Sequence, residues 1–134
     1  MPAIEVRPGI YWIGVNDRTT DLFEGVWPIT EAGVSYNCYL VKGDKTALID
    51  MAAGHHAAAF VDQLRDIIDP AELDYVIINH MEPDHTGAAG LLAGLAPRAE
   101  FLLSAKAEPL MSAYYGLTGR TRVVGDGETV SLGG

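Results

Sequence analysis

The feature that most restricts how this chain folds is a short apolar run without alternation, residues 75–78 (YVII), which ends abruptly in a polar segment. A strand with one solvated face alternates apolar and polar side chains, so four apolar residues in succession predict a strand covered on both faces, at the centre of a sheet. The polar segment 79–87 then lies at the carboxyl end of that strand, where open α/β sheets bind their ligands. The sequence therefore predicts a layered fold with a ligand site beside its central strand.

The remaining patterns place strands first and alternate helices with strands afterwards. Aromatic and β-branched residues predict strands at 10–15, 36–41, 46–50, 101–103 and 123–124, with a last one over 128–132. Apolar residues at helical spacing predict helices over 55–69, 88–95 and 110–115. The turn Lys42–Lys45 joins the second and third strands into an antiparallel hairpin. This order predicts an α/β (α+β) fold, a mixed sheet with its helices on one face.

The length of the chain supports one domain but leaves one face of the predicted sheet uncovered. A chain of 134 residues is long enough for a hydrophobic core and too short for a second independent domain. Three helices cover one side of the sheet, whereas the apolar residues of the N-terminal strands imply that the other side is covered too. We therefore expect a single, incomplete domain over residues 1–134, and a homo-oligomer in which a second copy covers the open face.

Composition excludes several classes of partner. Nine basic residues against eighteen acidic ones give a net charge of −9, which argues against nucleic acid and anionic membranes because both attract concentrated positive charge. No apolar stretch reaches the roughly 18 residues of a membrane span. The single cysteine, Cys38, cannot form an internal disulfide, and the first ten residues lack the pattern of a signal peptide. We predict a cytoplasmic location.

Two histidines and two carboxylates lie within six residues of the polar segment: His80, Glu82, Asp84 and His85. In an extended segment alternate side chains share a side, with roughly 6–7 Å between neighbours, so the first three donors face one way and Met81 faces the other. We expect Pro83 to keep the segment extended, because it biases Glu82 away from helical backbone angles. The sequence therefore predicts a row of metal-binding side chains.

A row of donors of this kind suits two metal ions about 3.5–4 Å apart. We expect His80 and Glu82 to bind the first ion, and Asp84 and His85 to bind the second. Equal numbers of carboxylates and imidazoles favour iron or manganese, although zinc accepts the same set and stays an alternative. Two protein ligands for each ion fall short of the three or four that metal sites usually have, so this set is incomplete.

Three further residues admit a role at this site, each with a plainer alternative. Asp50 closes a strand, where it can accept a hydrogen bond from a ligand histidine or cap the following helix. His55 and His56 are potential substitute ligands, but histidines at the start of an amphipathic helix are usually solvated, and we expect these two to be so. Cys38 is expected to pack as a small apolar group.

The segment 79–87, NHMEPDHTG, resembles the metal motif of the flavodiiron proteins, whose metallo-β-lactamase-like domain carries H-x-E-x-D-H where hydrolases of that fold carry H-x-H-x-D-H. Glu82 stands at the position that distinguishes the two groups. The segments 12–15, 22–25, 33–40 and 48–50 also resemble the first half of that domain. The resemblance covers the whole chain and implies half of an αββα sandwich.

The resemblance also implies a function. It implies a pair of non-haem irons that reduces O2 to water or NO to N2O, with His80, Glu82, Asp84 and His85 among its ligands. Electrons would come from FMN in a separate flavodoxin-like domain, or from a flavodoxin- or rubredoxin-like partner. The resemblance places Glu24 near the metals, where it either supports a ligand and relays protons or is a solvated loop glutamate.

The sequence departs from the family where the remaining ligands would stand. In the family each iron takes a further histidine and both share a bridging aspartate, all from the second half of the domain. Downstream of His85 this chain has no histidine, and its only aspartate there, Asp126, lies in a Gly-Asp-Gly turn. We therefore expect the N-terminal part of an O2 or NO reductase that is a poor catalyst alone. A non-catalytic fragment that self-associates is one alternative, and a dinuclear zinc hydrolase, against which Glu82 argues, is the other.

Overall fold

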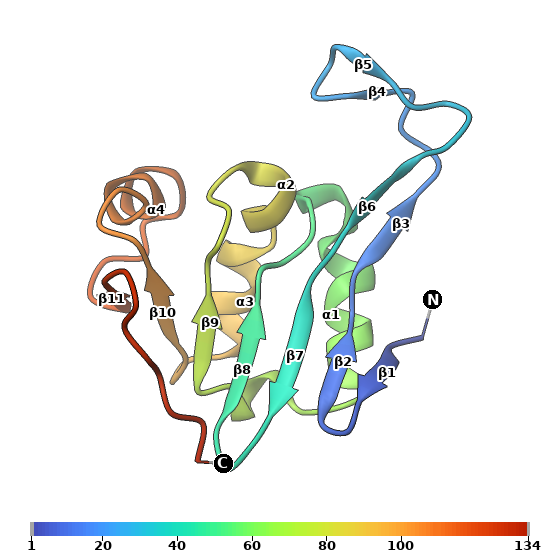
Figure 1. Cartoon of the computed structure of the whole chain (residues 1–134). Coiled ribbons are helices and arrows are strands. Elements are labelled where there is room, and N and C mark those ends of the chain that lie inside the picture. Colours follow the sequence, from blue (N-terminus) through green and yellow to red (C-terminus); the bar gives the residue numbers. More distant parts are fainter. Residues whose placement is uncertain (1, 134) are drawn as a thin grey trace.

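Residues 2–133, which the computed structural model describes, form a seven-stranded mixed sheet with helices packed behind it (Figure 1). Its strands, in spatial order, are β1 (Ile4–Arg7), β2 (Ile10–Trp12), β7 (Tyr39–Lys42), β8 (Thr46–Ile49), β9 (Tyr75–Ile77), β10 (Glu100–Leu103) and β11 (Thr121–Val123). Neighbours from β1 to β8 pair antiparallel, and neighbours from β8 to β11 pair parallel. The predicted mixed α/β sheet is confirmed, and β9 lies inside it between β8 and β10, as its apolar run predicts.

The helices lie behind the sheet and at its upper end as it is seen in Figure 1. They are α1 (Ala57–Arg65), α2 (Pro83–Thr86), α3 (Ala89–Leu95) and α4 (Glu108–Tyr115), with the short 3-10 turns η1 (Gly54–His56) and η2 (Pro70–Glu72). Phe60 of α1 and Leu92 of α3 are fully buried and belong to one apolar core with Val76 of β9. None of the described helices is long and apolar enough to cross a membrane.

Three helix boundaries differ by two residues or more from those predicted from the sequence. The helix predicted from residue 55 begins at Ala57, because His55 and His56 lie in the 3-10 turn η1. α1 ends at Arg65 and not at residue 69, because the chain beyond it tightens into a turn and the Asp69 side chain then accepts the Ala71 N–H to begin η2. Such a capping residue starts a new turn and so ends the old one. α4 begins at Glu108, two residues before the predicted start. Pro109 lies in its first turn, where the missing N–H costs no hydrogen bond.

Two of the predicted strands break, and their outer halves form a ribbon that leaves the main sheet. The strand predicted at 10–15 divides into β2 and β3 (Val15–Asp17), and the one at 36–41 divides into β6 (Val34–Tyr36) and β7. β3 pairs with β6, and the ribbon leads to a small hairpin of β4 (Leu22–Phe23) and β5 (Trp27–Pro28), at the upper right of Figure 1. The break includes Gly14, where a Cβ would collide with the carbonyl oxygen of Tyr36, so only glycine allows this close approach.

The strand predicted over 128–132 does not form. The Glu128 carboxylate accepts hydrogen bonds from the Gly125 N–H and from Arg122, and this closes a turn that directs the chain away from β11. The segment then runs back along the sheet toward the turn between β7 and β8, where the Lys45 N–H donates to the Leu132 carbonyl. One backbone hydrogen bond is too few for a strand ladder.

The two faces of the sheet differ in what covers them. The register aligns Trp12, Tyr39, Ile49, Ile77 and Leu102 in one row on the face turned away from the helical core. Figure 1 shows no helix over the part of this face formed by β7, β8 and β9. Trp12, Tyr39, Ile49 and Ile77 accordingly stay partly exposed. We call this row the open face. The predicted one-sided cover of helices is thus confirmed for the described residues.

Candidate metal centre

The predicted ligand segment begins where β9 ends, and a buried carboxylate from the neighbouring strand end holds it. Asp50 follows β8, has a left-handed backbone (φ 54°), and accepts hydrogen bonds on Oδ1 from the N–H groups of Asn79 (2.8 Å) and His80 (3.3 Å). Its other oxygen lies 3.9 Å from Nδ1 of His85, which is too far for a direct hydrogen bond. Asp50 therefore fixes the backbone of the donor segment, and it does not cap a helix.

The segment does not stay extended beyond Glu82, which corrects the prediction from the sequence. Glu82 is extended (ψ 155°), as the residue before a proline should be, but Pro83 is the first residue of the helical turn α2. The N–H groups of His85 and Thr86 both donate to the Glu82 carbonyl, and the Thr86 hydroxyl bonds to the same oxygen and to that of Met81. The turn folds Asp84 and His85 back toward the start of the segment.

This turn brings the donor atoms to one place. His80 Nε2 lies 3.2 Å from Glu82 Oε2 and 3.8 Å from Asp84 Oδ1, and His85 Nε2 lies 3.6 Å from Asp84 Oδ2. One ligand atom each from His80, Glu82 and Asp84 falls within 4.8 Å of the others, so the predicted spacing of roughly 6–7 Å along a line is wrong. The four side chains converge. Asp84 lies between the two histidines, with Oδ1 toward His80 and Oδ2 toward His85.

Two atoms of this group are buried polar atoms without a hydrogen bond in the described part of the chain. They are Asp84 Oδ1 and His85 Nδ1. A buried polar atom left without a partner costs about 1–3 kcal/mol, so native structures usually satisfy such atoms with protein, water or an ion. Two carboxylates and two imidazoles are also the donor set that iron accepts. The residues present therefore fit a metal site.

A cavity of about 390 Å³ adjoins Asp84 on the side of the β3–β6 ribbon. Glu24, which has a left-handed backbone (φ 53°) and an exposed side chain, lines the cavity together with Tyr36 and His55. Burial, reinforced by the carboxylates of Asp17 and Asp84, raises the pKa of the Tyr36 phenol, which therefore stays neutral at physiological pH. Glu24 and Asp84 therefore line the same cavity.

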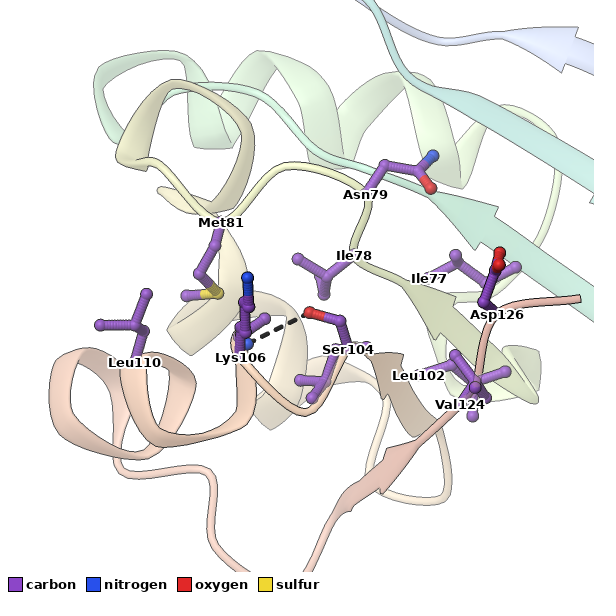
Figure 2. Close-up of a pocket in the computed structure, with 13 residues that line it drawn as sticks. Ile77, Ile78, Asn79, Met81, Leu102, Ser104, Lys106, Leu110, Val124 and Asp126 are labelled. Atoms are coloured by element: carbon purple, nitrogen blue, oxygen red, sulfur yellow. Dashed lines mark hydrogen bonds between the residues drawn. The ribbon is translucent and has the colours of Figure 1, made fainter. Parts of the chain in front are cut away.

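A second cavity, of about 500 Å³, lies at the carboxyl ends of β9 and β10 (Figure 2). Met81 points into it. Figure 2 shows Asp126, the one aspartate downstream of His85, on the far side of this cavity from Met81. Asp126 therefore does not join the donor group in the described structure.

Sequence reasoning missed a second group of donors, formed by Asp17, His55 and His56. Nε2 of His55 and of His56 lie 3.3 Å and 3.0 Å from Asp17 Oδ2. The expectation of solvated histidines is wrong for His56, whose side chain is 18% exposed, and right for His55, at 55%. The two histidines form a group of their own and do not substitute as ligands beside His80. Asp17 and His55 are 38 positions apart in the sequence, so no local sequence pattern predicts that they lie together.

Comparisons with known proteins agree with this fold. The sequence profile of the ODP family of beta-lactamases matches residues 34–133. A flavo-diiron protein of Clostridium acetobutylicum is 39% identical over 104 residues, which are 78% of this chain and 26% of that protein. A nitric oxide reductase of Moorella thermoacetica is 36% identical over 131 residues, 97% of this chain and 33% of that protein.

A solved structure gives the same result. The rubredoxin oxygen:oxidoreductase of Desulfovibrio gigas superposes with a TM-score of 0.91 at 30% identity, over 98% of this chain and 33% of that one. The predicted half of a metallo-β-lactamase-like domain is confirmed as a fold. The chain spans a third or less of the length of these three proteins. None of the three is named as a hydrolase, so the zinc-hydrolase alternative gains no support from them.

Proposed function

Because the chain belongs to the ODP beta-lactamase family, in the form that flavodiiron proteins carry, we propose that it is the N-terminal part of a diiron domain that reduces O2 to water or NO to N2O. The observation that carries this proposal is the convergence of His80, Glu82, Asp84 and His85 at the carboxyl end of β9. A polar loop without a function gives no reason for Asp84 Oδ1 to be buried without a partner.

The proposed roles follow from the positions of the donors. His80 and Glu82 would hold one iron, Asp84 and His85 would hold the other, and the two oxygens of Asp84 lie toward both histidines. Two adjacent ferrous ions, when bound, supply a place for O2 or NO and a route for electrons into it. Four donors are fewer than two ions require, so the remaining ligands come from elsewhere in the whole protein or from another chain.

The other residues position the donors. Asp50 is proposed as the positioning residue of the segment, because its carboxylate binds the N–H groups on which His80 depends. Glu24 is proposed as the acidic residue of the cavity beside Asp84, where it can exchange protons with bound water. Electrons would reach the site from FMN in a flavodoxin-like domain or from a rubredoxin-like protein. We predict that this takes place in the cytoplasm.

The test is the iron content of the full chain, purified without a chelating tag and reconstituted with ferrous salt in the absence of oxygen. We expect iron to remain bound after gel filtration, and the double variant Glu82→Gln/Asp84→Asn to retain less of it. Asp62→Asn, which removes an exposed carboxylate on α1, is the matched control and should keep the iron. Equal iron in all three proteins, or none in any, would refute the proposal.

A second candidate function is favoured by the open face. Trp12, Tyr39, Ile49 and Ile77 form an apolar row without a covering helix in the described structure, and a second copy of the chain would bury it. In that case the chain is a self-associating component without activity of its own. The molecular mass in solution distinguishes this candidate from a monomer.

A further inference from the structure

The second group of donors, Asp17, His55 and His56, has the spacing of a mononuclear metal site. Ligands of a tetrahedral ion that each lie about 2.0–2.1 Å from the metal are roughly 3.3 Å from one another. Here His55 Nε2 and His56 Nε2 lie 3.3 Å and 3.0 Å from Asp17 Oδ2, and one ligand atom from each of the three residues falls within 4.8 Å of the others. The two distances to Asp17 Oδ2 match the spacing of ligands around such an ion.

The carboxylate of this group is ionised and held in place. Asp17 is fully buried at the end of β3, and its Oδ1 accepts hydrogen bonds from the N–H and hydroxyl of Thr19 and from the N–H of Thr20. The Thr20 hydroxyl donates to Oδ2. Burial by itself raises the pKa of this carboxyl, but its hydrogen bonds from Thr20 and Thr19 and its close approach to the His56 ring outweigh burial and hold the pKa well below its usual range. Four hydrogen bonds thus fix the carboxylate, three of them on Oδ1 and one on the Oδ2 that faces the two imidazoles.

The imidazoles are not both satisfied by this oxygen. Oδ2 of Asp17 already accepts the Thr20 hydroxyl and lies at hydrogen-bond distance from His55. His56 Nε2 is buried, and although it lies close to the same oxygen it makes no hydrogen bond within residues 2–133, because its ring is not aligned with that oxygen. A buried ring nitrogen without a partner, beside a carboxylate and a second imidazole, is explained by a cation between them.

The group is also positioned and accessible. Tyr36 packs against both rings, with ring centroids 6.2 Å from His55 and 5.7 Å from His56, and so holds them in place. His55 lines the 390 Å³ cavity that Asp84 also lines, so one side of the group faces open space. An ion bound there has a path of entry and room for a water molecule as a further ligand.

We propose that Asp17, His55 and His56 bind one divalent transition-metal ion, at a site separate from the donors of the proposed diiron centre. Two imidazoles and one carboxylate are typical of sites for Fe²⁺, Co²⁺ or Zn²⁺, whereas Mg²⁺ and Ca²⁺ take mainly oxygen ligands. The site stands whether or not the chain proves to be part of a reductase, because none of its residues belongs to the first group.

The experiment titrates Co²⁺ into the full chain, purified without a chelating tag, and follows the visible absorption that Co²⁺ gains in a site of low symmetry. The background variant His80→Gln/Glu82→Gln/Asp84→Asn removes the other group, so its result does not depend on iron binding there. We expect the background variant to bind about one Co²⁺, and Mg²⁺ in excess not to compete. Adding His56→Gln should weaken Co²⁺ binding roughly tenfold or more.

Two further variants keep the test decisive. His55→Gln changes a half-exposed side chain, so it should fold normally, as circular dichroism can verify, and should still weaken Co²⁺ binding roughly tenfold or more. Asp21→Asn removes an exposed carboxylate from the same loop and should leave Co²⁺ binding unchanged. In the otherwise unmutated chain, His55→Gln should lower the total Co²⁺ bound by one equivalent. A folded background variant without Co²⁺, or equal loss in His55→Gln and Asp21→Asn, would overturn the proposal.

Discussion

At the scale of single residues, the donor group depends on a carboxylate that is not one of its donors. Asp50→Gly keeps the left-handed backbone without strain and removes the carboxylate that accepts the N–H groups of Asn79 and His80. We expect the free energy of unfolding to fall by about 1–3 kcal/mol, and iron binding to weaken because the backbone at His80 loosens. Urea denaturation measures the first effect. Asp50→Asn keeps an acceptor and tolerates the same φ, so it should lose less, and equal losses in both variants would contradict this role.

Cys38 provides a residue-scale prediction about pH. Burial, with a smaller contribution from the Asp50 carboxylate, raises the pKa of its thiol to about 12. At pH 8 only about one thiol in ten thousand is then ionised in the folded chain, so iodoacetamide should react slowly until urea unfolds the protein. The thiol of the unfolded chain ionises near pH 8.5. The contribution of the neutral thiol to the free energy of unfolding is therefore present below that pH and is lost as the pH rises toward 12. Cys38→Ala should flatten this alkaline decline in stability. Rapid labelling of the folded chain would contradict the prediction.

At the scale of elements, local signals predicted well what they control locally. The apolar run at 75–78 identified β9, and the hairpin of β7 and β8 followed from the turn between them. Pro83 was misinterpreted because a proline carries two signals: it keeps its predecessor extended, and it also fits the first position of a helix. The hydrogen bonds from the Thr86 hydroxyl to the carbonyls of Met81 and Glu82 favour the helical position for Pro83. The spacing of apolar residues in the sequence does not predict these bonds.

The contact between α2 and η1 is an element-scale feature that the two donor groups share. A Cβ on Gly87 would collide with the backbone nitrogen of Gly54, so Gly87→Ala should force the two turns apart and lower the free energy of unfolding by about 1–3 kcal/mol. Gly90→Ala in α3 is the matched control. A Cβ there meets nothing within 4 Å, and the variant should be more stable by roughly 0.5–1 kcal/mol. Urea denaturation of both variants should give changes of opposite sign, and changes of the same sign would refute the close contact.

At the scale of the whole molecule, the features that the sequence did not predict depend on contacts between residues far apart in the chain. The four donors of the first group lie within six residues and were visible as a motif, even though their spacing was predicted wrongly. Asp17 meets His55 only because the β3–β6 ribbon bends away from the sheet at Gly14 and passes beside η1. A bend of this kind depends on a close approach between two strands, and a single sequence does not encode it in any local pattern.

The open face and the net charge act against each other at this scale. Burial of the apolar row favours association of two copies, whereas a charge of −9 on each copy opposes it. We therefore expect a reversible dimer or larger assembly that strengthens as salt screens the repulsion, measured as mass in analytical ultracentrifugation at several salt concentrations. Ile49→Glu places a charge within the row and should leave a monomer. Leu91→Glu, on an exposed position of α3, adds the same charge elsewhere and should not. A chain that is monomeric at every salt and protein concentration would show that the open face is covered in some other way.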